Sequence, residues 1–118
     1  MIRFESLNGC LGVAVRVLDI SADFDDDTMR QLVSVFCDKR LIVITDQVCD
    51  KQVYRNFALR WGTPIPHVLD HLRMPDYPDM MAIGNMEQKD RSDAVRNGAA
   101  LWHTDLSYEA VPASATML

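Results

Sequence analysis

Hydrophobic and polar positions in the first half of the chain predict two strands, each followed by a helix. Valines 13, 15 and 17 repeat with a period of two, which predicts a strand over residues 12–18. Apolar residues at 29, 32, 33 and 36 follow a run of aspartates at helical spacing, so a helix is expected over residues 26–38. The aliphatic run 41–45 then predicts a short buried strand.

The second helix is expected to begin after Asp50, whose side chain suits the N-cap position. Val53, Phe57 and Trp61 recur at helical spacing and form one apolar stripe. Gly62 suits the left-handed position that follows a helix, and the proline two residues later cannot continue the helix. The pattern therefore predicts a helix that ends at about residue 61.

Beyond residue 62 the periodicity weakens. Prolines are frequent over residues 63–78, which predicts a long loop, and residues 80–83 resemble a strand. Residues 87–98 are polar and predict a surface loop, whereas strand character returns at 101–106 and 113–118. Strands and helices in this order favour an α+β domain over a doubly wound sheet.

Composition fits one globular domain over residues 1–118, with 48% hydrophobic and 25% charged residues. The longest aliphatic run, 41–44, is far shorter than the roughly 20 residues of a membrane span. The N-terminus shows no secretory signal pattern. Cys10, Cys37 and Cys49 are odd in number and widely spaced, so we expect free thiols and a cytoplasmic protein.

Charge argues against nucleic acid as a partner. The net charge is −5, and the basic residues are scattered rather than gathered into a stripe that could neutralise phosphates. The acidic run 23–27 has two interpretations, a cation site or the start of a helix, where carboxylates favour the positive end of the dipole. We favour the helix start.

The residues His103 and Asp105 carry the candidate chemistry. On a strand, residues two apart point to the same face, so both side chains would converge on one point. An imidazole and a carboxylate suit Fe(II), Mn(II) or Zn(II), and a second histidine would complete the facial triad of non-haem iron oxygenases. The alternative is an aspartate that only orients a histidine.

The residues around this pair resemble a known family. The segment W-H-T-D-L-S-Y over 102–108, followed by P-A-S-A-T over 112–116, resembles the metal-binding segment of the taurine dioxygenase and chlorophenoxyacetate dioxygenase family. Asp46 and Gln47 after the second strand, and the F-A-x-x-W-G pattern at 57–62, are similar to further elements of that family. The resemblance runs through nearly the whole chain and is most specific at 102–105.

This resemblance implies an Fe(II)- and 2-oxoglutarate-dependent dioxygenase that consumes O2. It would hydroxylate a small organic acid, of the sulfonate or aryloxyacetate type, with release of succinate and CO2. His103 and Asp105 would be the first two iron ligands. His67 would contact the acidic group of the substrate, or else face solvent as a loop residue, and Asn85 would border the same pocket.

The implied fold is the N-terminal part of a double-stranded β-helix (jelly roll) with flanking helices. In this family the second metal histidine, the arginine that binds 2-oxoglutarate and a threonine that contacts it lie far downstream. We therefore expect residues 1–118 to be a catalytic domain truncated before the distal metal ligand, with an incomplete core. The chain alone would then be catalytically incomplete.

Two alternatives stay open at this point. His67 and His71 have the H-x-x-x-H spacing that chelates zinc on a helix, and with His103 they would form a hydrolytic zinc site. The chain could instead be an inactive truncated domain or an interaction module, since open sheet edges pair with other chains. The substrate and the oligomeric state are undetermined, a homo-oligomer being one option.

Overall fold

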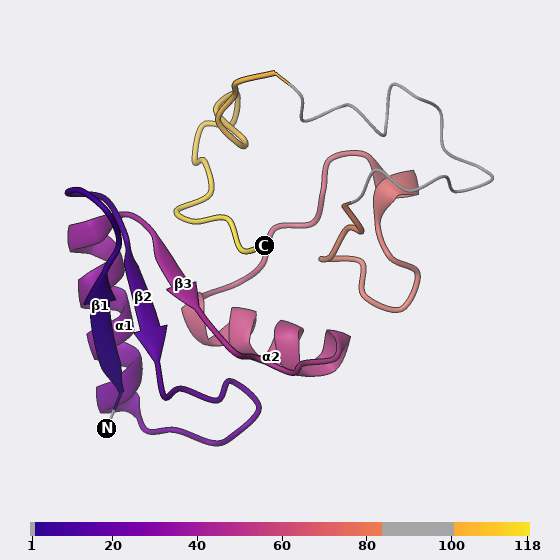
Figure 1. Cartoon of the computed structure of the whole chain (residues 1–118). Coiled ribbons are helices and arrows are strands. Elements are labelled where there is room, and N and C mark those ends of the chain that lie inside the picture. Colours follow the sequence, from indigo (N-terminus) through magenta and orange to yellow (C-terminus); the bar gives the residue numbers. More distant parts are fainter. Residues whose placement is uncertain (1, 84–100) are drawn as a thin grey trace. The chain divides into compact units, whose positions relative to one another are not determined.

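The computed structural model describes residues 2–83 and 101–118, and the chain divides into two compact units, Met1–Thr63 and Pro64–Leu118. The first unit holds a three-stranded sheet and two helices (Figure 1). Its strands are β1 (Arg3–Ser6), β2 (Val13–Arg16) and β3 (Ile42–Ile44), and its helices are α1 (Asp26–Lys39) and α2 (Lys51–Trp61). The mixed α+β character expected from the sequence is confirmed, whereas the jelly roll stays a prediction.

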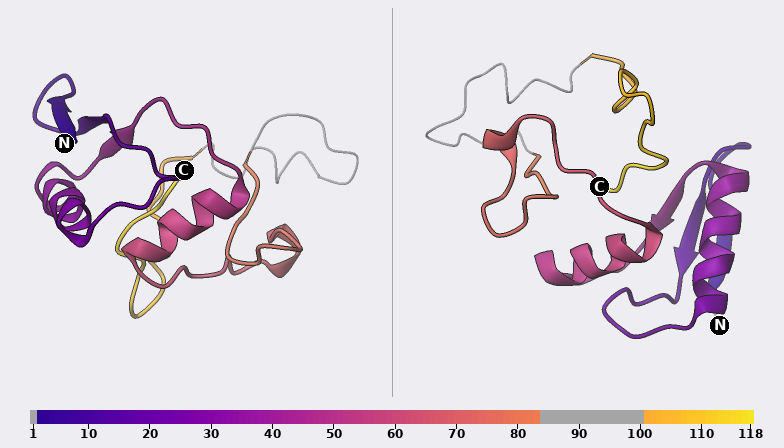
Figure 2. Two further views of the ribbon diagram at one scale, coloured as in Figure 1. Left: turned by 90° about the horizontal axis from the view of Figure 1, so that it is seen from below. Right: turned by 180° about the vertical axis from the view of Figure 1, so that it is seen from behind.

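The strand order is β1-β2-β3. β1 pairs with β2 antiparallel, and β2 pairs with β3 parallel, with Val13 opposite Ile42 and Val15 opposite Ile44. The parallel pair needs a crossover connection, and α1 provides it. The helix lies along one face of the sheet in both the front and the rear view (Figures 1 and 2).

The β2 strand is shorter than its valine pattern predicts. Val13, Ala14 and Val15 are all buried, so the strand has two covered faces rather than one. Val17 is 78% exposed with φ 63°, a left-handed conformation that a β-branched residue rarely adopts. The period-two pattern therefore ends at Arg16, where the chain turns out of the sheet. The sequence analysis did not predict β1.

Both helices begin where the sequence predicts. The Asp25 carboxylate accepts a hydrogen bond from the Thr28 N–H at 2.8 Å, and the Asp50 carboxylate accepts one from the Val53 N–H at 2.9 Å. The acidic run is thus the start of α1. Gly62 ends α2 with φ 147° and ψ −166°, outside the left-handed helical region expected for it. The conformation is nevertheless one that favours glycine.

The core of the first unit lies between the sheet and the helices. Seven apolar residues are buried in the part of the chain that the structure describes: Val13, Ala14, Val15, Leu18, Met29, Leu32 and Phe57. Trp61 stands edge-on to Phe36 and to Phe57, with ring centroids 5.6 and 6.2 Å apart, so aromatic contacts join α2 to α1. The β3 strand is only half-buried, contrary to expectation, with Val43 41% exposed.

Gly12 directly precedes β2 and lies at a crowded position. Its φ is 88°, and a Cβ atom there would lie 3.0 Å from Leu7 Cδ1 and 3.3 Å from Leu41 Cδ2. A larger residue would be strained in its backbone and would crowd both leucines. This glycine therefore lets the loop before β2 pack against the start of β3.

The second unit contains little regular structure. Its described residues form a 3-10 turn at Asp70–Leu72 and a single antiparallel bridge between Arg73 and Met81. The strand expected over 80–83 is reduced to that bridge, and the strands expected over 101–106 and 113–118 are not formed. The loop over 63–78 is confirmed apart from its 3-10 turn, and the loop over 87–98 lies outside the described residues.

Neither helix in the described part of the chain has the length and apolar content that a membrane crossing requires.

Candidate metal centre

Asp105 begins a turn, and His103 lies in the irregular segment just before it, rather than on a strand. Residues 105–108 form this turn, Leu106 has φ 53°, and the Glu109 N–H donates to the Leu106 carbonyl at 3.0 Å. The prediction of a strand was wrong. A segment with strand-forming residues becomes a strand only when it pairs with another strand, and no described strand pairs with residues 101–106. Trp102, which precedes His103, is fully exposed instead of joining a core.

The turn nevertheless brings the two side chains together. His103 Nε2 lies 3.3 Å from Asp105 Oδ1, and both side chains are about half exposed. His103 Nδ1 lies 2.7 Å from the Leu101 carbonyl oxygen. In the neutral ring this bond places the proton on Nδ1 and leaves Nε2 unprotonated, 3.3 Å from the carboxylate oxygen. The pair therefore presents one nitrogen and one oxygen donor atom to the same point.

The separation of these atoms fits two ligands of one metal ion. Ligand atoms about 2.1 Å from a metal lie about 3.0 Å apart at an octahedral angle and about 3.4 Å apart at a tetrahedral angle. The observed 3.3 Å falls between these values. Without a metal, the same geometry lets Asp105 pair with a protonated His103, the orienting role considered above.

A third side chain completes the cluster. Thr116 Oγ1 donates a hydrogen bond of 2.7 Å to Asp105 Oδ2, whereas His103 lies beside the other carboxylate oxygen, Oδ1. This threonine belongs to the P-A-S-A-T segment over residues 112–116, and no role was predicted for it. Thr116 lies eleven residues after Asp105, a spacing that matches neither helix nor strand periodicity. The contact could therefore be found only in the structure.

His67 and His71 do not form the helical pair that a zinc site needs. His71 belongs to the 3-10 turn Asp70–Leu72, whereas His67 precedes it in the loop. Among the described residues no three or more His, Cys, Asp or Glu side chains gather closely enough to hold a metal. The helical premise of the zinc hydrolase is therefore wrong, because the proline-rich loop allows one short turn only.

The ring of His67 is oriented by its own loop. Its Nδ1 accepts a hydrogen bond from the Leu69 N–H at 3.1 Å, and its backbone carbonyl accepts one from Arg73 Nε at 2.7 Å. The same Nδ1 lies 3.4 Å from the Leu69 carbonyl oxygen, so the two contacts fit different tautomers of the ring. With the proton on Nε2, His67 offers an N–H donor that could meet an acidic group. Asn85, the other expected substrate contact, lies outside the described residues.

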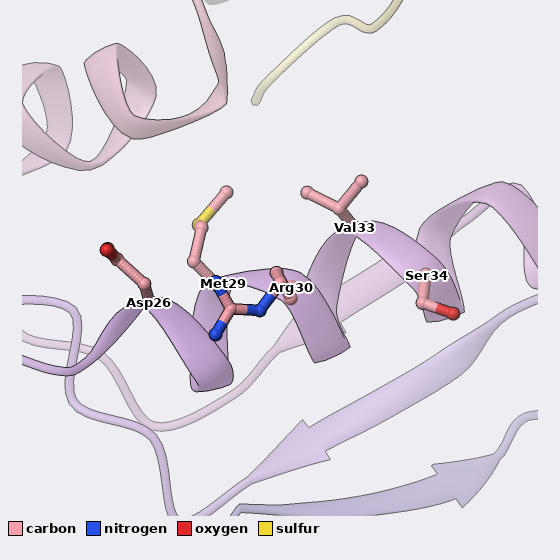
Figure 3. Close-up of a pocket in the computed structure, with 5 residues that line it drawn as sticks. All are labelled: Asp26, Met29, Arg30, Val33 and Ser34. Carbon is pink, nitrogen blue, oxygen red and sulfur yellow. The ribbon is translucent and has the colours of Figure 1, made fainter.

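The two hollows described on the first unit have no pair of side chains comparable with His103 and Asp105. A shallow hollow of about 530 Å³ lies along α1, lined by Asp26, Met29, Arg30, Val33 and Ser34 (Figure 3). Met29 and Val33 project from the same side of the helix, and the Arg30 guanidinium is paired with Asp27. No histidine or cysteine lines this hollow, so it resembles an open helix face more than a reaction site.

A smaller hollow of about 240 Å³ lies between residues 20–24 and α2 and contains Arg60. This guanidinium donates to the Phe24 carbonyl at 2.7 Å, lies 3.3 Å from the Asp26 carboxylate and stacks 4.2 Å above the Phe24 ring. Its donors and its charge are engaged within the fold. Arg60 therefore joins α2 to the segment before α1 rather than offering an anion site.

The three cysteines, Cys10, Cys37 and Cys49, are free and exposed, as expected. Among the described residues, no cysteine joins His103 in a group that could hold a metal. The candidate metal ligands among these residues are therefore His103 and Asp105, with Thr116 bonded to Asp105.

Comparisons with known proteins place this arrangement in context. Residues 3–118 match the family model described as taurine catabolism dioxygenase TauD, TfdA family. No curated protein matches significantly. The chain is similar to the crystal structure of AAD-2 in complex with Mn(II) and N-oxalylglycine, with a TM-score of 0.71 and 20% identity over 96% of this chain and 39% of that chain.

A second similar structure is a taurine dioxygenase from Burkholderia xenovorans. The TM-score is 0.59 with 15% identity, over 65% of this chain and 28% of that chain. At such low identity these likenesses show a shared fold. The chain thus spans less than two fifths of the length of either structure.

Proposed function

The chain belongs to the taurine catabolism dioxygenase TauD, TfdA family, and on this premise we propose that it supplies two metal ligands of an Fe(II)- and 2-oxoglutarate-dependent dioxygenase. The ligands are His103 Nε2 and one oxygen of Asp105. The observation that carries the proposal is the 3.3 Å separation of these donor atoms, which suits adjacent positions on one metal ion.

Bound Fe(II), together with 2-oxoglutarate and O2, supplies the oxidising chemistry, and the reaction releases succinate and CO2. The residues of this chain hold the metal and orient the side chains that bind it. The Leu101 carbonyl keeps the proton of His103 on Nδ1, so that Nε2 stays available as a ligand. The structurally similar AAD-2 contains Mn(II) and N-oxalylglycine, which supports a divalent metal and a dicarboxylate-like co-substrate at the corresponding site.

We propose a small organic acid of the sulfonate or aryloxyacetate type as the substrate. His67 supports this assignment because a ring N–H of its imidazole is a donor that suits an anionic group. Asn85 is proposed as a second residue that borders the substrate. The net charge of −5 and the scattered basic residues argue against nucleic acid as a partner. The proposed setting is the cytoplasm.

One observation favours a second candidate function, an inactive or interaction module. Leu101, Trp102, Val111 and Leu118 are 81% to 104% exposed, an unusual amount of apolar surface for one short stretch of chain. A partner that covered these side chains would give the segment a binding role without catalysis. The two candidates differ in whether the protein binds a divalent metal through His103.

Metal binding by the unchanged chain and its variants tests the proposal. Mn(II) is titrated anaerobically, and the unbound ion is followed by its electron paramagnetic resonance signal. We expect His103→Ala and Asp105→Ala each to weaken the affinity by more than about tenfold. His71→Ala is the matched control and should leave the affinity unchanged, because His71 lies outside the cluster.

A second measurement addresses the reaction. Succinate is quantified after incubation with Fe(II), 2-oxoglutarate and a panel of sulfonates and aryloxyacids. Metal affinity that does not depend on His103 would contradict the proposal. Because the chain alone is expected to be catalytically incomplete, succinate formed by it would contradict that expectation.

A further inference from the structure

The cluster contains a residue whose role nothing so far explains. Thr116 donates a hydrogen bond of 2.7 Å to Asp105 Oδ2, whereas Asp105 Oδ1 lies 3.3 Å from His103 Nε2. The two carboxylate oxygens thus have separate partners. We infer that Thr116 is a positioning residue, which orients the Asp105 carboxylate so that only Oδ1 faces the metal. This inference rests on the proposed function.

The chemistry of the contact suits that role. A hydroxyl that donates to a carboxylate forms a charge-assisted hydrogen bond, which is shorter and stronger than a neutral one. The threonine hydroxyl has one proton, so it satisfies one oxygen and leaves the other available. Partners that hold metal-binding side chains in this way fix both their orientation and their donor strength.

Apart from Thr116, the described residues hold the carboxylate only through the 3.3 Å contact with His103. The Asp105 side chain is 47% exposed, and the residues around it from 101 to 105 and from 107 to 112 are exposed as well. An exposed aspartate samples several side-chain rotamers, and binding a metal in one of them costs conformational entropy. The hydrogen bond from Thr116 restricts the carboxylate to one rotamer before the metal arrives.

The same contact sets how many oxygens Asp105 can give to the metal. A carboxylate can bind through one oxygen or through two. With Oδ2 held by Thr116, binding through Oδ1 alone keeps the hydrogen bond, whereas binding through both oxygens would compete with it. Thr116 therefore keeps one more position on the metal open for a co-substrate.

The test compares Thr116→Val with Thr116→Ser in the Mn(II) titration. Valine has the shape of threonine without the hydroxyl, so we expect an affinity about 10- to 100-fold weaker. Serine keeps the hydroxyl and should keep the affinity close to that of the unchanged chain. Ser114→Ala is the matched control, because it removes an exposed hydroxyl from the same segment two residues away.

The outcomes separate this inference from the proposed function. If the unchanged chain binds Mn(II) through His103 but Thr116→Val binds equally well, the positioning role is wrong and the metal site stands. If the unchanged chain does not bind Mn(II) through His103, the proposed function itself fails. Equal weakening by Val and Ser would assign Thr116 a packing role and would overturn the inference. Far-UV circular dichroism checks that the fold of each variant is retained.

Discussion

Gln47 shows how one side chain can hold several backbone segments. Its Nε2 donates to the carbonyls of Leu18 and Thr45 at 2.6 and 2.7 Å, and its Oε1 accepts from the Ile20 N–H at 2.9 Å. These bonds join the end of β3 to the loop that follows β2. In the sequence, Asp46 and Gln47 were visible only as a family-like pair, because the contacts reach 27 and 29 residues back along the chain.

Replacing Gln47 should therefore cost stability. We expect Gln47→Ala to lower the free energy of unfolding by about 1–3 kcal/mol, because three part-buried backbone groups lose their partner. Urea denaturation measures the effect. Gln31→Ala, at an exposed position of α1, is the control and should change stability by less than about 0.5 kcal/mol. Equal effects of the two variants would contradict the assigned role.

The candidate site was predicted in part. His103 and Asp105 were identified by their spacing and do converge, but through a turn rather than on the strand that the spacing assumed. Thr116 was not assigned a role, since its contact depends on how residues 105–116 fold back. Residue type indicated the chemistry, and the orientation of the side chains required the structure.

Among the elements, helices were predicted far better than strands. Helix α1 was expected over 26–38 and spans Asp26–Lys39, because its caps and apolar spacing lie within the helix itself. A strand depends on a partner that the local sequence does not specify. Thus β1 forms from a segment with little pattern because β2 lies beside it, whereas the apolar segment 113–118 forms no strand.

The N-cap of α1 makes the first unit sensitive to acid. The backbone N–H of Thr28, followed by its hydroxyl, lowers the pKa of Asp25 below its ordinary value. A group whose pKa is lower in the folded chain stabilises the fold above its unfolded pKa, and this stabilisation is lost as the pH falls through the folded pKa. The stabilisation that this cap provides is therefore lost below about pH 4.

Asp25→Asn tests this dependence. Asparagine caps helices about as well as aspartate but does not titrate. We expect the variant to lose less stability than the unchanged chain between about pH 5 and pH 2. The measurement is the urea midpoint at each pH. Identical losses in the two proteins would show that the Asp25 cap does not contribute to the acid response.

At the scale of the whole molecule, the two units differ in how they bury apolar side chains. All seven buried apolar residues of the described part lie within Met1–Thr63. The described residues of Pro64–Leu118 bury none and include the exposed side chains of Trp102 and Val111. The weaker periodicity beyond residue 62 pointed toward this difference, but its extent did not follow from the sequence because burial depends on contacts between distant segments.

Hydrogen exchange of the full chain should follow the same division. Backbone amides open with free energies that rise with the density of buried contacts around them. We expect the slowest exchange in β2 and α1, around Val15 and Leu32, and much faster exchange over residues 101–118. Nuclear magnetic resonance or mass spectrometry would measure it. Strong protection over 101–118 would contradict this view of the second unit.

The placement of the two tryptophans gives each unit its own fluorophore. Trp61 lies against the rings of Phe36 and Phe57, with its indole nitrogen buried, whereas Trp102 is fully exposed and directly precedes His103. An indole among aromatic rings emits at shorter wavelength than one in water, so the two emissions differ in colour. Blue emission then reports the folding of the first unit, and quenching of the red emission by a paramagnetic ion reports occupancy beside His103. One spectrum of the unlabelled chain follows both events.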